Sequence, residues 1–138
     1  MKLRVALAQV NPTVGDLVAN AALVRSNFKT AQDAGAHIVV FPEMVLTGYP
    51  VEDLALRPSF QLASQSALAE LAGSLTGKTV AIVGYLDQVN GSPQNMVAVI
   101  SNGKVAARYA KCHLPNYGVF DEFRNFVPGD QTLEVRIH

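Results

Sequence analysis

Residues 37–43 read His37-Ile38-Val39-Val40-Phe41-Pro42-Glu43, an apolar run that ends in a proline and a carboxylate. The run predicts a buried strand over 37–41, and the proline predicts that the strand ends there because it cannot donate to a ladder. Glu43 would then lie just after the end of this strand, at the start of the following loop. Open α/β sheets place their chemistry at that edge.

A strand and a helix are expected before this run. Residues 3–10 alternate between apolar and other side chains and stop at Asn11-Pro12, which predicts a strand buried on both faces. An amphipathic helix follows, with Asp16 as its N-cap and Gly35 as its C-terminal cap. Its apolar stripe recurs every three or four residues, at Leu17, Ala21, Val24, Phe28 and Ala31. Short connections predict that the two strands are parallel and joined by a right-handed crossover.

The rest of the chain predicts one more helix and two hairpins. After a loop over 42–58 that is rich in proline, glycine and acids, a helical stripe runs from Phe60 to Leu75 and ends at Gly77. Strand-like runs cover 79–87, 94–101 and 104–110. The turns between these runs contain Asn90-Gly91 and Asn102-Gly103, and Asn-Gly is the strongest short hairpin signal. Residues 1–138 are therefore expected to form one α/β folding unit.

Composition and charge exclude several classes of function. The chain has 138 residues, 49% hydrophobic and 16% charged, so it can bury a core. Its 11 basic and 11 acidic residues balance, which leaves no positive field to attract nucleic acid. No apolar stretch reaches the roughly 20 residues of a membrane helix, and the start does not have the pattern of a signal peptide. A single cysteine cannot close an internal disulfide, so we expect a cytoplasmic protein.

Residues 133–138, the last of the chain, alternate between apolar and polar side chains as a half-buried strand does. The sequence stops there without a turn or a cap. Because a strand at a terminus needs a neighbour to pair with, we expect these residues to form a strand and the chain to be part of a longer protein.

A second candidate site residue, Lys111, follows the strand expected over 104–110. A carboxylate such as Glu43 can act as a general base, and a lysine beside it can stabilise an oxyanion. Taken singly, each residue is more typical of a solvated side chain at a strand end. The pair is informative only if both side chains reach one cavity.

The one cysteine, Cys112, stands beside His113 and invites a thiol-imidazole dyad. Neighbours in an extended segment point to opposite faces, so Cys112 should face away from both His113 and Lys111. We expect it to be a small, buried or half-buried apolar group. The histidines at 37, 113 and 138 have no metal-ligand spacing, and no glycine-rich phosphate loop is present.

The connection over 111–130 is long enough to predict a functional loop. Its phenylalanines, Phe120, Phe123 and Phe126, are spaced by three, which equally fits a turn of helix packed on the core. Tyr117 is harder to assign to a core because its hydroxyl needs a hydrogen-bond partner.

Several strings together closely resemble the nitrilase superfamily of carbon-nitrogen hydrolases over essentially the whole chain. They are Phe41-Pro42-Glu43 with Thr47-Gly48-Tyr49-Pro50, Lys111-Cys112-His113-Leu114-Pro115, and Phe120-Asp121-Glu122. Within that superfamily, residues 48–60 and 114–122 look like the glutaminase domain of glutamine-dependent NAD synthetases. The opening residues 7–16 fit the same subfamily.

The resemblance implies an α-β-β-α sandwich of nitrilase type with a Glu-Lys-Cys triad. Glu43 would be the proton acceptor, Lys111 would hold the oxyanion, and Glu122 would be a supporting carboxylate. Tyr117 would line the glutamine site, with Tyr49 near its mouth. The family's nucleophilic cysteine lies one strand further on. Residues 1–138 would therefore be the N-terminal part of the domain, without its C-terminal half, and would be inactive alone because the nucleophilic cysteine is missing.

The resemblance also implies partners. The substrate would be L-glutamine, and the ammonia released would pass to a separate synthetase domain that amidates deamido-NAD with ATP and Mg²⁺. This chain itself would hold no cofactor, and the complete protein would be a large homo-oligomer. Two alternatives stay open. One is a free-standing amidase, carbamoylase or nitrilase, and the other is an inert assembly module whose apolar surface docks the missing half or another subunit.

Overall fold

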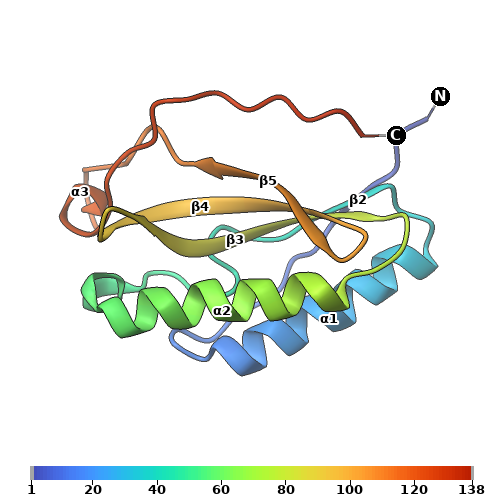
Figure 1. The fold of residues 1–138 in the computed structure, drawn as a ribbon, viewed down its shortest axis with the longest axis horizontal. Helices are drawn as coiled ribbons and strands as arrows, with labels where there is room; N and C mark the ends of the chain where they lie inside the picture. Colours follow the sequence, from blue (N-terminus) through green and yellow to red (C-terminus); the bar gives the residue numbers. More distant parts are fainter. Residues whose placement is uncertain (1, 138) are drawn as a thin grey trace.

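Five strands form one mixed sheet, and two long helices cover one of its faces, in the computed structural model, which describes residues 2–137 (Figure 1). The strands are β1 (Val5–Leu7), β2 (Ile38–Val40), β3 (Val80–Val89), β4 (Ser92–Ser101) and β5 (Lys104–Ala110). The long helices are α1 (Leu17–Asp33) and α2 (Pro58–Ser74), and two short ones are η1 (Glu52–Leu56) and α3 (Glu122–Asn125). The α/β class expected from the sequence is confirmed.

The strand order is β1-β2-β3-β4-β5. The first three strands are parallel, because α1 and α2 carry the chain back between them, and β3, β4 and β5 are antiparallel. Both hairpin turns have the expected form: Asn90, Gly91, Asn102 and Gly103 all have positive φ, between 44° and 81°. Asparagine and glycine tolerate this conformation, which matches the twist of the flanking strands.

Local signals also fix the ends of α1. The Asp16 carboxylate accepts a hydrogen bond from the Ala19 N–H at 3.0 Å, and Gly35 follows the helix with φ of 72°. The apolar stripes of α1 and α2 meet the inner face of the sheet, with Val24, Leu71 and Val83 all fully buried. Burial of a side chain of this size contributes about 1.5–3 kcal/mol. The core therefore lies between the two helices and the sheet.

The opposite face of the sheet has no helix on it, and we call it the helix-free face (Figure 1). Val40, Ile82, Val97, Val99 and Tyr109 lie on it and line open hollows. Residues 2–137 thus form the α-β half of the expected α-β-β-α sandwich.

The prediction that residues 3–10 are buried on both faces is wrong. Ala6 and Ala8 pack against the core, but Leu3, Val5 and Leu7 are 56%, 44% and 71% exposed. The reason is position, because β1 is an edge strand and one of its faces belongs to the helix-free side. Alternation identified the strand without revealing whether its second face is covered.

The strand expected over 133–138 does not form within the described residues, and His138 lies outside them. The chain from Val127 is anchored at its start by the N–H of Val127 to Pro93 O and of Gly129 to Lys111 O, both at 2.9 Å. It then crosses over the helix-free face, where Leu133, Val135 and Ile137 line a hollow with Val97. An alternating pattern makes a strand only when an edge is offered for pairing, and this segment lies over a face.

The described part of the chain contains no helix with both the length and the apolar character to cross a bilayer.

Candidate active site

Glu43 follows β2 in a tight turn that lies against β3. The N–H of Leu46 donates to Gly84 O at 3.1 Å, and the N–H of Val45 donates to Pro42 O at 3.2 Å. Gly84 permits this approach, because a Cβ there would collide with Met44 N and lie 3.0 Å from Pro42 O. The missing side chain of Gly84 thus lets the turn carry Glu43 across β3.

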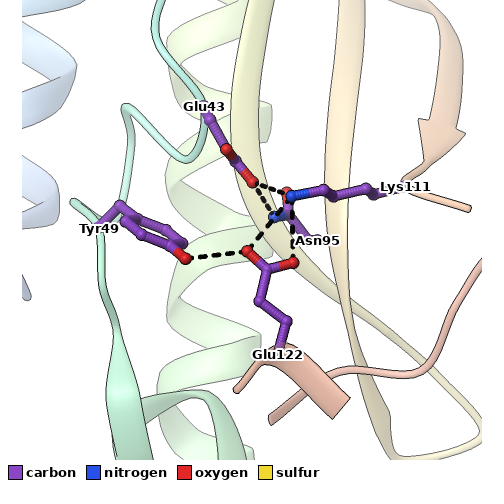
Figure 2. A network of polar contacts seen from close by, with 5 residues as sticks. All are labelled: Glu43, Tyr49, Asn95, Lys111 and Glu122. Atoms are coloured by element: carbon purple, nitrogen blue, oxygen red, sulfur yellow. Dashed lines mark hydrogen bonds and ion pairs between the residues drawn. The ribbon is translucent and has the colours of Figure 1, made fainter. Parts of the chain in front are cut away.

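Lys111 approaches the same point from the end of β5. Its N–H donates to Asn95 O at 2.9 Å, and its Nζ lies 2.8 Å from Glu43 Oε1 (Figure 2). The expected convergence of Glu43 and Lys111 is therefore confirmed. The lysine side chain is 28% exposed and that of Glu43 is 47% exposed, so the pair lies at a rim rather than deep in the core.

Glu122 and Tyr49 complete the other side of the cluster. Lys111 Nζ lies 3.1 Å from Glu122 Oε2, and the Tyr49 hydroxyl donates to Glu122 Oε1 at 2.9 Å (Figure 2). The Glu122 side chain is only 4% exposed, and its Oε2 accepts no hydrogen bond within residues 2–137. Lys111 therefore balances this buried carboxylate by charge and stands between two acids.

Asn95 is the member of the cluster that the sequence did not identify. It is buried in β4, and its Nδ2 donates to Glu43 Oε1 at 2.6 Å. A signal was present, because an amide side chain directly precedes the apolar run 96–100 of that strand. A buried polar group needs a partner, but the sequence does not say which one.

The electrostatics of the cluster keep Lys111 charged. Burial lowers the pKa of Lys111, but hydrogen bonds and charge from Glu43 and Glu122 outweigh it, so the pKa is raised above its ordinary value. Burial, together with the hydrogen bond to Glu122, raises the pKa of Tyr49. Lys111 is thus a permanent cation and Tyr49 a neutral donor near pH 7, which suits the lysine to stabilise negative charge rather than to accept a proton.

A hollow of about 290 Å³ opens on the helix-free face beside the cluster. Its lining is mainly apolar, and it includes Val40, Ile82, Val97 and Tyr109 together with Glu43, Asn95 and Lys111. A carboxylate and an ammonium at the wall of an apolar hollow of this size can meet a small carboxamide group.

Cys112 is half-buried, as expected, and stands outside this cluster. Its Sγ lies 3.3 Å from the Tyr109 hydroxyl, which donates to it, and 3.4 Å from Gln131 O. The neighbouring His113 is exposed. Among residues 2–137, no group of three or more histidine, cysteine or acidic side chains is arranged to hold a metal ion.

Tyr117 is not brought into the cluster by any contact among the described residues. Its side chain is 72% exposed and packs edge-to-face on Phe120, with ring centroids 5.8 Å apart. The helical turn suggested by the phenylalanine spacing does form as α3, but only Phe126 is buried, while Phe123 is 58% exposed.

Comparison with known proteins agrees with this geometry. The profile of the family described as carbon-nitrogen hydrolase matches residues 4–137. A glutamine-dependent NAD(+) synthetase of Thermotoga maritima is 42% identical over 137 residues, which are 99% of this chain and 24% of that protein. The chain therefore spans about a quarter of the length of this curated relative.

Solved structures give the same relationship. A glutamine-dependent NAD+ synthetase of Acinetobacter baumannii, in complex with ADP, matches with a TM-score of 0.88 and 38% identity over 95% of this chain and 25% of that one. An amidase from Nesterenkonia shares the fold at a TM-score of 0.75 and 24% identity, over 94% of this chain and 49% of that one. A family match across nearly the whole sequence establishes that this chain belongs to the carbon-nitrogen hydrolase family.

Proposed function

We propose that this chain is the N-terminal part of the glutaminase domain of a glutamine-dependent NAD synthetase, and that the complete domain hydrolyses the side-chain amide of L-glutamine. The observation that carries the proposal is the 2.8 Å contact between Lys111 Nζ and Glu43 Oε1 at the wall of the apolar hollow. The family membership supports the reaction class, and the NAD synthetases among the relatives support the substrate.

In the proposed reaction, Glu43 takes the proton of a thiol, and the thiolate attacks the amide carbon of glutamine. The carbonyl oxygen becomes an oxyanion, which the Lys111 ammonium stabilises. The carbon-nitrogen bond then breaks, and Glu43 returns the proton to the leaving ammonia. Water, deprotonated by Glu43, attacks the thioester and releases glutamate, which restores the thiol.

Cys112 does not supply that thiol in our proposal. Its Sγ faces Tyr109 and Gln131 rather than Glu43 and Lys111. The helix-free face beside the cluster is open, so a cysteine carried by residues outside 1–138 can approach Glu43 from there. The 138 residues alone would then lack glutaminase activity.

The remaining site residues receive supporting roles. Glu122 holds Lys111 from the side opposite Glu43, and Tyr49 orients Glu122 through the hydrogen bond at 2.9 Å. Tyr117, exposed on the loop that leads to α3, would line the glutamine site once substrate is bound.

The wider reaction would lie in the complete protein. Ammonia would pass to a synthetase domain that amidates deamido-NAD with ATP and Mg²⁺, and the protein would be a homo-oligomer. The support is the printed function of relatives four times as long as this chain.

A free-standing amidase of the same family is the second candidate, favoured by the fold shared with the Nesterenkonia enzyme. An amidase would use the same Glu43 and Lys111 but would need no synthetase partner. The third candidate is an inert assembly module that docks through its apolar surface, and the exposed apolar residues of β1 are the observation that favours it.

The test uses the complete gene product and compares glutamine-dependent with ammonia-dependent synthesis of NAD. We expect Glu43→Gln to reduce glutamine hydrolysis at least ~100-fold, because the proton acceptor is lost, and to leave ammonia-dependent synthesis intact. Glu70→Gln is the matched control, since Glu70 is an exposed carboxylate whose nearest cation, on Arg25, is 3.8 Å away.

Three other results would each point elsewhere. Hydrolysis of simple amides without any synthesis of NAD would favour the amidase. No turnover of any amide would favour the assembly module. Near-normal glutaminase activity in Glu43→Gln would remove Glu43 from its assigned role.

A further inference from the structure

Asn95 makes one hydrogen bond that has no part in the reaction as written above. Its Nδ2 and the Nζ of Lys111 both donate to the same oxygen of Glu43, Oε1, at 2.6 and 2.8 Å (Figure 2). Within residues 2–137, no hydrogen bond reaches the other oxygen, Oε2. The two oxygens of this carboxylate are therefore not equivalent.

We infer that Asn95 is a positioning residue, which fixes Glu43 through Oε1 and so leaves Oε2 as the oxygen that takes and returns the proton. The inference rests on the proposed function, because it assigns the atom through which Glu43 would act. A carboxylate held by two donors at one oxygen loses the freedom to rotate and keeps the lone pairs of the second oxygen available.

The direction of this hydrogen bond follows from chemistry. An ionised carboxylate has only acceptors, so the amide must present its NH₂ group to Glu43. Asn95 is 4% exposed, so its amide group is shielded from bulk water, although the Glu43 side chain is 47% exposed. A hydrogen bond to a charged group in such a place holds its partner more firmly than one at the surface.

Lys111 cannot hold Glu43 by itself throughout the reaction. Its Nζ is shared, at 2.8 Å from Glu43 and 3.1 Å from Glu122, and it would also have to face the oxyanion. As the ammonium turns toward the substrate, its hold on Glu43 weakens. Asn95 is neutral and donates to Glu43 alone among these acids, so it retains the carboxylate at that moment.

Asn95 also touches Lys111 through its main chain, because its carbonyl accepts the N–H of Lys111 at 2.9 Å. A side-chain substitution leaves this backbone bond in place. Asn95→Leu, which has nearly the same size, therefore removes only the donor to Glu43. Gln94→Leu is the matched control, since Gln94 is the preceding residue of β4, strand alternation points its side chain to the opposite face of the sheet, and no hydrogen bond joins it to the cluster within residues 2–137.

In the complete gene product, we expect Asn95→Leu to lower kcat for glutamine roughly 10- to 100-fold, with KM changed less than about threefold. Asn95→Thr, whose hydroxyl can donate, should recover part of kcat. Gln94→Leu should keep both kcat and KM.

Crystal structures of the same variants give a readout that does not depend on activity. In Asn95→Leu the Glu43 carboxylate should turn away from its place, and in Gln94→Leu it should keep it. If Asn95→Leu does not fold, Asn95→Thr carries the same comparison with a smaller loss of kcat.

Wild-type kcat in the Asn95 variants, with Glu43 in its original place, would overturn the inference. An inactive wild-type protein would overturn the proposed function. In that case the position of Glu43 in the Asn95→Leu crystal would still decide whether Asn95 holds it.

Discussion

Lys111 Nζ and Glu43 Oε1 are 2.8 Å apart although 68 residues separate them and β3 and β4 lie between the strands that precede them. Three strand spacings put β2 and β5 roughly 14 Å apart. The contact is possible only because the turn after β2 crosses the middle of β3 at Gly84, and because the long lysine side chain reaches back over β4. The site is thus built across the sheet rather than between neighbouring strands.

Because the turn after β2 packs against Gly84, we expect Gly84→Ala to lower both the stability and the activity of the protein. The added methyl would collide with Met44 N and press on Pro42 O and Glu43 C, at 3.0 and 3.1 Å. We expect a loss of about 1–3 kcal/mol in the free energy of unfolding by urea, because overpacking against backbone cannot relax easily. Glutaminase activity should fall as well, since Glu43 is displaced.

Gly73→Ala serves as the control for that variant. Gly73 lies in α2 with nothing within 4 Å of the site of a Cβ, so alanine should stabilise the helix by about 0.5–1 kcal/mol. Equal free energies of unfolding for Gly84→Ala and the wild type would contradict the close packing of the turn after β2 against Gly84.

Because Lys111 is the cation shared by Glu43 and Glu122, we expect Lys111→Met to lower the free energy of unfolding markedly. The substitution leaves the Glu122 carboxylate buried with only the Tyr49 hydroxyl as donor, which should cost about 1–3 kcal/mol of unfolding free energy at pH 7. The pKa of Lys111 is raised, so its stabilising contribution is fully present at pH 7 and is lost only as pH rises through the value in the folded protein. Lys29→Met, which breaks an exposed pair with Asp33, should cost less than about 1 kcal/mol. A Lys111 variant no less stable than the Lys29 variant would show that the cluster does not depend on its cation.

The position of Cys112 predicts that Cys112→Ala keeps glutaminase activity within about twofold, because its thiol faces away from Glu43. The loss of its weak contacts to Tyr109 and Gln131 should cost at most about 1 kcal/mol of stability. Mass spectrometry of the acyl-enzyme in the complete gene product provides the check. Loss of the thioester in this variant, with stability unchanged, would make Cys112 the nucleophile after all.

Two tyrosines, Tyr49 and Tyr85, lead us to expect a loss of stability at high pH. Burial and a hydrogen bond to a carboxylate raise the pKa of both Tyr49 and Tyr85 above the ordinary value. Above about pH 10, the unfolded chain releases protons that the folded protein keeps, so the free energy of unfolding falls as the pH rises. Titration by tyrosinate absorbance should show fewer tyrosinates in the folded protein, and Tyr49→Phe should remove one of the late-titrating groups. Equal titration of folded and denatured protein would contradict the packing of these two hydroxyls.

Much of the fold could be predicted from the sequence because it depends on local interactions. The N-cap at Asp16, the positive φ of Gly35 and the two Asn-Gly turns each involve only a few consecutive residues. The local sequence is therefore sufficient to predict them. The apolar periodicity of α1 and α2 likewise identifies the faces that form the core.

The sequence by itself determined the helices, the hairpins and the presence of Glu43 and Lys111 at strand ends, because each depends on short-range propensity and pattern. Tertiary structure alone decided that Asn95 shares Glu43 with Lys111, that β1 exposes Leu7, and that the alternating residues 133–137 lie over a face of the sheet and not beside an edge strand. These outcomes depend on which segments, distant along the chain, become neighbours. No local pattern carries that information, because the free energy that selects those neighbours comes from burial and charge shared across the whole sheet.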